Sequence, residues 1–127
     1  MEKEILFWSA MVYTVLLCAT MIGFGWLFLH RPPKDINSLY GYRTSMSMKN
    51  RRTWLFAHQY AGKIWFYSGI ISFVVSVPLL LFTRKVNCFE TLTTILLFVL
   101  MVPVIGVILP TERALRKRFD RFGNPKE

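Results

Sequence analysis

The sequence predicts an all-α membrane protein: a single domain with three transmembrane helices, the second extended at its cytoplasmic end, plus a C-terminal amphipathic interfacial helix. Hydrophobic residues make up 54% of the 127 residues and charged residues only 18%, which is too apolar for a soluble domain of this length. Three stretches also carry no charged side chain: 5–29, 64–82 and 92–109. Each approaches the roughly 20 residues that a helix needs to cross a bilayer.

The first span, residues 5–29, has one face of small side chains, because Ala10, Thr14 and Cys18 recur at intervals of four. Such a face lets another helix approach closely. The proline pair at 32–33 ends the helix, since proline has no backbone N–H and disfavours helical geometry in the residue before it. The chain starts with an acidic rather than a basic segment and lacks a small-residue cleavage site, so we expect this span in the mature protein.

The second span, residues 64–82, follows a cytoplasmic loop of residues 30–63 that ends in helix. We expect this helix to begin near Ser45 or Ser47, whose hydroxyl can cap free N–H groups, and to continue through the membrane. A helix of that length exceeds the bilayer thickness, so its first turns project from the membrane or lie in its interface. Four residues in these turns recur every four positions and form one ridge: Asn50, Trp54, His58 and Gly62.

The third span, residues 92–109, is followed by a basic cytoplasmic tail, residues 110–127. Three apolar residues of this tail fall on one side of a helix: Leu115, Phe119 and Phe122. Basic residues occupy most of the remaining surface, which is typical of an amphipathic helix on a membrane surface. We expect Gly123 to be the C-cap of this helix.

The net charge of +9 is distributed unevenly along the chain. The loop 30–63 carries seven Lys and Arg residues and the tail 110–127 carries six, so thirteen of the sixteen lie on one side of the membrane. The positive-inside rule makes that side the cytoplasm and places the N-terminus outside. We therefore expect the basic residues to contact a lipid bilayer with anionic headgroups and not nucleic acid.

The connection between the first two spans carries a motif. Residues 36–63 have the sequence INSLYGYRTSMSMKNRRTWLFAHQYAGK, in which Asn37 and the run Gly41-Tyr42-Arg43-Thr44 precede the ridge that starts at Asn50. This order and spacing resembles the signature of the SdpI-like family of small bacterial membrane proteins. The resemblance covers about a fifth of the chain residue by residue, and the two spans that follow are also similar to the layout of that family.

The resemblance implies a location in a bacterial cell membrane and a role in toxin immunity, sensing or sequestration. The founding member of the family is an immunity protein that protects a sporulating Gram-positive bacterium from its own secreted toxin. In its toxin-bound form, that protein holds a transcriptional repressor at the membrane. It has six spans, whereas this chain resembles a three-span module. The partners implied are a peptide toxin, a repressor or a larger membrane protein.

The motif also supplies the candidate binding site. A guanidinium at the membrane interface can bind a phosphate or carboxylate through two parallel hydrogen bonds. Arg43 is therefore the central residue of the candidate site. The expected ligand- or partner-binding residues are Asn37, Tyr40, Gly41, Tyr42, Arg43, Thr44, Asn50, Trp54, His58 and Gly62. A structural alternative stays open, because irregular backbone near a membrane must be tied down by side chains. In it, Arg43 bonds the last carbonyls of the first helix or pairs with Asp35, while Asn50 and Trp54 hold the loop down.

The sequence gives no support for catalysis or for a resident cofactor. It has no Ser/His/Asp set, no phosphate loop and no intramembrane carboxylate pair. No acidic or cysteine cluster stands at metal-ligand spacing from His30 or His58. We expect no enzymatic activity, no metal and no cofactor. The alternatives to a binding protein are an accessory subunit of a larger membrane complex and a small enzyme or carrier acting on lipid or quinone. A homo-oligomer is compatible with a binding protein and would count against the accessory subunit.

Overall fold

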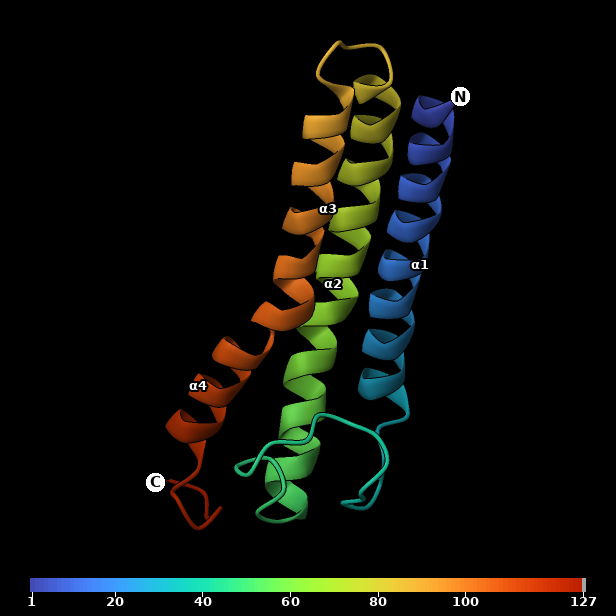
Figure 1. The fold of residues 1–127 in the computed structure, drawn as a ribbon. Helices are drawn as coiled ribbons and strands as arrows, with labels where there is room; N and C mark the ends of the chain where they lie inside the picture. The colour runs from blue at the N-terminus through green and yellow to red at the C-terminus, as the bar shows by residue number, and fades with distance from the viewer. Residues whose placement is uncertain (127) are drawn as a thin grey trace.

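The computed structural model, which describes residues 1–126, contains three long helices side by side and a short fourth helix that turns away from them (Figure 1). In chain order these are α1 (Glu2–His30), α2 (Arg51–Thr83), α3 (Phe89–Gly106) and α4 (Ile108–Arg118). The N-terminus lies at the same end as the α2–α3 connection, and the C-terminus lies at the opposite end, near the loop that joins α1 to α2. The predicted fold class is confirmed.

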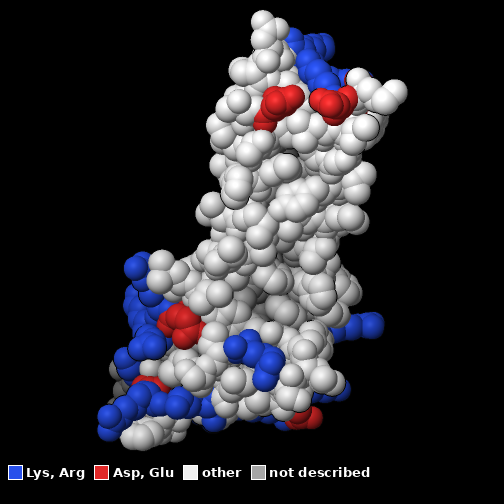
Figure 2. All heavy atoms as spheres, in the orientation of Figure 1, with Lys and Arg blue, Asp and Glu red and all other residues white. Residues whose placement is uncertain are grey.

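The surface of the helices is that of a membrane protein. Three helical segments are long and apolar enough to span a bilayer: α1, α2 and α3 together with α4. Figure 2 shows charged side chains gathered at both ends of the molecule and a belt without charge between them. Large apolar side chains of this belt, such as Ile71, Phe98 and Val102, are exposed. Exposure of so much apolar surface to water is unfavourable, whereas the acyl chains of a bilayer can cover it. The chain is therefore a multi-pass membrane protein.

α1 and α2 pack tightly because glycines lie at their crossing. A Cβ atom added at Gly25 would lie 2.4 Å from the backbone nitrogen of Phe66. One added at Gly62 would lie 2.8 Å from the Cβ of Phe28. The predicted small-residue face of the first span is confirmed, since its three members are buried: Ala10, Thr14 and Cys18. Gly62, at the end of the predicted ridge, therefore serves the contact between two helices.

The start of α2 differs from the prediction. The helix begins at Arg51 with Asn50 as its N-cap, and not near Ser45 or Ser47. Ser47 instead closes a separate turn with Thr44, because the backbone N–H of each residue donates to the hydroxyl oxygen of the other. Hydroxyl side chains often compete with helix in this way. Asn50 thus precedes the helical ridge and does not belong to it.

α3 and α4 meet at a break at Val107, where the chain bends away from α2 (Figure 1). Pro110 contributes to this break, since it has no N–H to donate to the carbonyl of Gly106. The expected amphipathic helix is present as α4, but its apolar side faces the protein. Leu115 is fully buried, and so is nearly all of Phe119. The protein itself covers these two side chains.

The residues after α4 form a turn. Phe119 is the C-cap of the helix, so the expected cap at Gly123 is wrong. Gly123 instead has a φ of 85°, and its N–H donates to the carbonyl of Asp120. Backbone N–H groups, first that of Asn124 and then that of Phe122, donate to the Asp120 carboxylate and lower its pKa. Phe122, the third apolar residue of the predicted helix face, is exposed.

Candidate functional site

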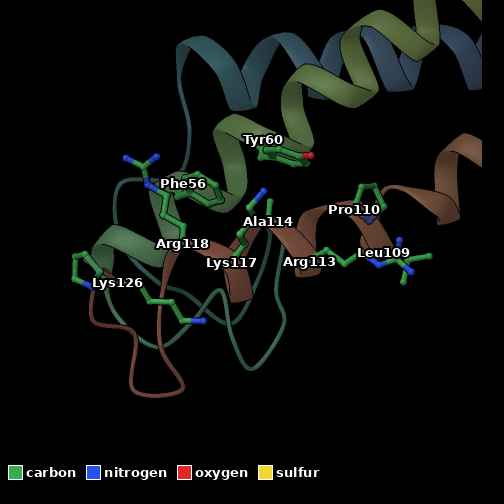
Figure 3. Close-up of a pocket in the computed structure, with 10 residues that line it drawn as sticks. Phe56, Tyr60, Leu109, Pro110, Arg113, Ala114, Lys117, Arg118 and Lys126 are labelled. Carbon is green, nitrogen blue, oxygen red and sulfur yellow. The ribbon is translucent and has the colours of Figure 1, made fainter.

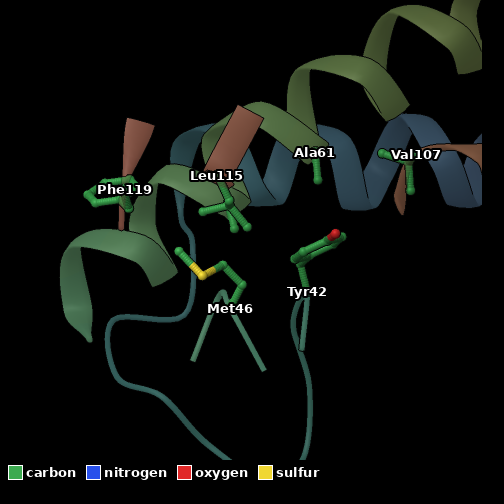
Figure 4. Close-up of a cluster of buried hydrophobic side chains, with 7 residues drawn as sticks. Tyr42, Met46, Ala61, Val107, Leu115 and Phe119 are labelled. Carbon is green, nitrogen blue, oxygen red and sulfur yellow. The ribbon is translucent and has the colours of Figure 1, made fainter. Parts of the chain in front are cut away.

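The loop, the first turns of α2 and the C-terminal segment form one body, which we call the cap (residues 31–62 and 107–126). Its centre is a cluster of buried apolar side chains, most of which are shown in Figure 4. The loop, α2 and the C-terminal segment all contribute to it: Tyr42, Met46, Ala57, Ala61, Val107, Leu115 and Phe119. The loop is therefore a packed part of the protein and not a free connector.

Trp54 and His58 hold the loop against α2. The indole N–H of Trp54 donates to the carbonyl oxygen of Pro33 (2.7 Å). The Nε2 atom of His58 accepts the backbone N–H of Tyr42 (2.9 Å), and its Nδ1 lies 2.7 Å from the carbonyl oxygen of Trp54. These partners require a neutral ring with its hydrogen on Nδ1, and they use both nitrogens. His58 is fully buried and has no nitrogen left for a metal or ligand.

Gly41 lets the loop approach this pair of side chains. Its φ of 124° lies where residues with a side chain are rarely found. A Cβ atom there would lie 2.7 Å from Nε2 of His58 and 3.0 Å from Cη2 of Trp54. The glycine of the motif is thus required by backbone conformation and by space.

Asn37 and Tyr40 shape the exposed arm of the loop. The side-chain oxygen of Asn37 accepts the N–H groups of Leu39 (3.0 Å) and Tyr40 (2.8 Å), which closes a local turn. The ring of Tyr40 lies 6.4 Å from that of Phe28, while Leu39 is 90% exposed. Asn37 therefore acts on its own turn, in which Tyr40 is the other candidate residue.

Asn50 joins the loop, α2 and the tail. Its side-chain oxygen accepts the N–H of Thr53, and the hydroxyl of Thr53 accepts the N–H of Asn50, which makes a reciprocal helix cap. The Asn50 amide also donates to the carbonyl oxygen of Gly123 (2.7 Å). One side chain thereby fixes the start of α2 and the position of the C-terminal turn.

Glu112 bonds two of the predicted site residues, although it is not itself one of them. Its Oε1 atom accepts the hydroxyls of Tyr42 (2.8 Å) and Thr44 (2.6 Å). Burial, and next the hydrogen bond to Glu112, raise the pKa of Tyr42. The sequence signal was present, because Glu112 is the lone acid in the basic segment 110–119. Its partners lie far away in the sequence, so only the fold reveals them.

Replacing Glu112 by alanine should destabilise the protein by about 3 kcal/mol, because two partly buried hydroxyls lose a charged acceptor. Glu112→Gln keeps an acceptor oxygen and should cost only about 1 kcal/mol. The free energy of unfolding in detergent measures both effects. Glu90→Ala, which removes an exposed acid at the other end of the molecule, is the control and should cost less than about 1 kcal/mol. Equal costs for Glu112→Ala and Glu90→Ala would contradict the assigned role.

Arg43 lies between these fixed residues, but its side chain is exposed. Trp54 and Asn50 hold the loop as the structural alternative expects, but neither of its Arg43 contacts is present. The ion pair in the described part of the chain joins Arg84 to Glu4 at the opposite end. The last carbonyl groups of α1 bond elsewhere, with that of Leu29 accepting the amide of Gln59. Arg43 is left without a hydrogen bond or ion pair to any described residue.

Arg43 instead lines a pocket of about 210 Å³, which we call the Arg43 pocket. Its walls come from α1, the loop, α2 and the α3–α4 junction, and include Phe28, Tyr42, Thr44, Trp65 and Val104. The rings of Phe28 and Trp65 are stacked, with centroids 6.1 Å apart. The Nε1 atom of Trp65 is buried and has no hydrogen-bond partner among the described residues. The pocket is thus lined by a cation without a partner and by a tryptophan whose buried N–H is unpaired.

The matches to known proteins include the whole motif. A family model described as the SdpI/YfhL protein family matches residues 34–111, which include all ten predicted site residues. Over 51 residues, 40% of the chain, the sequence is 45% identical to a protein of Bacillus subtilis (strain 168) named "Uncharacterized protein YfhL". That match spans 46% of the relative's length, and no solved structure matches the chain. Since the family model covers well over half of the chain, the protein belongs to the SdpI/YfhL family.

Proposed function

We propose that this protein binds an anionic group of a partner in the Arg43 pocket. The observation that carries the proposal is the unpaired guanidinium of Arg43 at a pocket that is also lined by Trp65, whose buried N–H has no partner among the described residues. A buried N–H without an acceptor costs about 1–3 kcal/mol, so a ligand oxygen placed there gains free energy. A carboxylate or phosphate offers that oxygen and also a second oxygen for the guanidinium.

The other motif residues support this function by fixing the position of Arg43. On one side of it, Gly41 packs on Trp54 and the N–H of Tyr42 is held by His58. On the other side, Thr44 is held by Ser47 and Glu112. A backbone held on both sides loses little further freedom on binding, which favours affinity.

The cap faces the cytoplasm in this proposal, because it contains most of the Lys and Arg residues of the chain. Reporter fusions that place the C-terminal tail outside the cell would contradict this orientation. The partner is a protein or peptide that presents a carboxylate at the inner surface of a bacterial cell membrane. Capture of such a group is compatible with toxin immunity, sensing or sequestration, and it requires no chemistry from the protein.

The indole N–H signals of isotope-labelled protein in detergent micelles test the pocket directly. On titration with acetate or inorganic phosphate, we expect the Trp65 signal to move and the Trp54 signal to stay, because Trp54 already donates to Pro33. Arg43→Gln should weaken this response at least about tenfold, since a charged hydrogen bond is lost. Arg43→Lys should fall in between, because lysine keeps the charge and loses the planar fork.

Arg31→Gln is the matched control, since it removes the same charge from an exposed arginine at the end of α1. A Trp65 signal that does not respond, or an equal loss in Arg31→Gln, would reject the pocket. The two probes also separate ligand classes: a response to acetate alone indicates a carboxylate partner, and a response to phosphate alone indicates a phosphorylated one.

A tolerance assay tests the biological role. Cells that express the protein should survive a secreted peptide toxin encoded near its gene, and cells with Arg43→Gln should not, although both proteins accumulate equally. If expression gives no tolerance to any such peptide, the immunity role fails, while the titration still decides whether the pocket binds anions.

A further inference from the structure

A second and larger pocket, of about 770 Å³, opens between the first turns of α2 and α4 (Figure 3). We call it the α2–α4 groove. It shares no lining residue with the Arg43 pocket. In Figure 3, Phe56 and Tyr60 come from α2 on one side, and Arg113 and Lys117 come from α4 on the other. The proposed function does not use any of these residues.

The charge of the groove is entirely positive, since four of its lining residues are basic and none is acidic. Two of the four have partners within the protein: the guanidinium of Arg118 lies 5.4 Å from the ring centroid of Phe56, and Lys126 donates to the carbonyl oxygen of Arg116. Arg113 and Lys117 have no hydrogen bond or ion pair with the described residues. They stand one turn apart on α4, where like charges repel, so an anion between them would stabilise the helix.

The remaining wall of the groove is apolar and adjoins the membrane-spanning part of the chain. Leu109 lies at the end of the predicted third span, three residues before the charged residue Glu112, and it is 59% exposed. Arg113 follows it by one helical turn. Tyr60 faces this region from α2 and is partly exposed. The groove therefore leads from the edge of the apolar belt to a cationic end.

We propose that the α2–α4 groove binds one anionic phospholipid. Its phosphate lies between Arg113 and Lys117, and the upper part of its acyl chains covers Tyr60 and Leu109. Free phosphate would satisfy the cations but leave the apolar wall uncovered, whereas a phospholipid satisfies both. The volume of the groove also lies in the range of ligand sites, about 300–1,000 Å³. The bound lipid joins α4 to α2 below the break at Val107.

Native mass spectrometry of the detergent-solubilised protein, titrated with phosphatidylglycerol or phosphatidylcholine, tests this proposal. We expect one phosphatidylglycerol to bind at a concentration at which phosphatidylcholine does not. The variant Arg113→Gln with Lys117→Gln should weaken this binding by roughly 30-fold, because each cation near an anionic lipid contributes about a factor of five. The matched control, Arg51→Gln with Arg52→Gln, removes the same charge from exposed residues at the start of α2, outside the groove.

A variant with unchanged charge distinguishes lipid binding in the groove from general attraction of lipid to a basic surface. Ala114→Leu fills part of the groove and should also reduce phosphatidylglycerol binding. Three results would overturn the proposal: equal binding of the two lipids, an equal loss in the Arg51 and Arg52 control, or unchanged binding in Ala114→Leu. The unfolding temperature of each variant is measured beside that of the wild-type protein. An unchanged unfolding temperature shows that reduced binding does not come from loss of the fold.

Discussion

Replacing Gly41 by alanine is expected to destabilise the protein by about 3 kcal/mol or more and to release the loop from α2. At a φ of 124° a side chain alone costs about 1–3 kcal/mol. The new methyl group would also lie 2.7 Å from Nε2 of His58. His58 has no room to retreat, because it is fully buried and both of its nitrogens are hydrogen-bonded. We expect the hydrogen bond from the backbone N–H of Tyr42 to Nε2 of His58 to be lost.

The unfolding temperature of purified protein in one detergent measures this effect, and Gly23→Ala is the control. A Cβ atom added at Gly23 meets nothing within 4 Å, so that variant should change the stability by less than about 1 kcal/mol. Equal behaviour of the two variants would mean that the loop does not depend on its contact with His58 and Trp54.

The fold class was predictable because it depends on a local property. A stretch without charge and about 20 residues long is sufficient to predict a spanning helix, whatever it packs against. The start of α2 depends instead on a competition between two sets of hydrogen bonds. Ser47 is a good cap by composition, but it bonds to Thr44 in its own turn, and Asn50 with Thr53 caps the helix. The sequence alone does not show which set is stronger.

The motif was recognisable, and holding the loop was one expected task of Asn50 and Trp54, but the individual contacts of the motif residues were not predictable. The four-residue spacing correctly places Trp54, His58 and Gly62 on one ridge. The ridge then serves two contacts: Trp54 and His58 face the loop, whereas Gly62 faces α1. A helix face can be predicted from periodicity, but its neighbours depend on the tertiary fold. The same limit explains why Glu112 did not stand out as the partner of Tyr42 and Thr44.

Most of the motif residues are thus occupied within the protein. Asn50, Trp54 and His58 all use their side-chain polar groups in bonds to the backbone. Arg43 is the charged residue of the motif that remains free. In this chain, the motif is therefore a support that presents one arginine at a pocket. This division explains why substitution of different motif residues should have different consequences, loss of stability for the supporting residues and loss of binding for Arg43.

Replacing Gly25 by alanine is expected to separate α1 from α2 and to destabilise the protein by about 2–3 kcal/mol. The added methyl group would lie 2.4 Å from the backbone nitrogen of Phe66 and 2.8 Å from the carbonyl oxygen of Gly62. Both are backbone atoms of α2, so no side-chain rotation relieves the contact and the helices must move apart. Overpacking of this kind typically costs 1–3 kcal/mol.

The same substitution should weaken anion binding at a distance. Phe28 of α1 and Trp65 of α2 form a stacked wall of the Arg43 pocket, and their contact depends on the close approach of the two helices at Gly25. We expect the response of the Trp65 indole signal to acetate to be reduced in Gly25→Ala and retained in Gly23→Ala. A variant that loses stability but keeps this response would show that the pocket depends on the loop alone. Loss of both the stability and the response to acetate would show that the site depends on the helix crossing. The position of Trp65 would then be set by α1 and that of Arg43 by the loop.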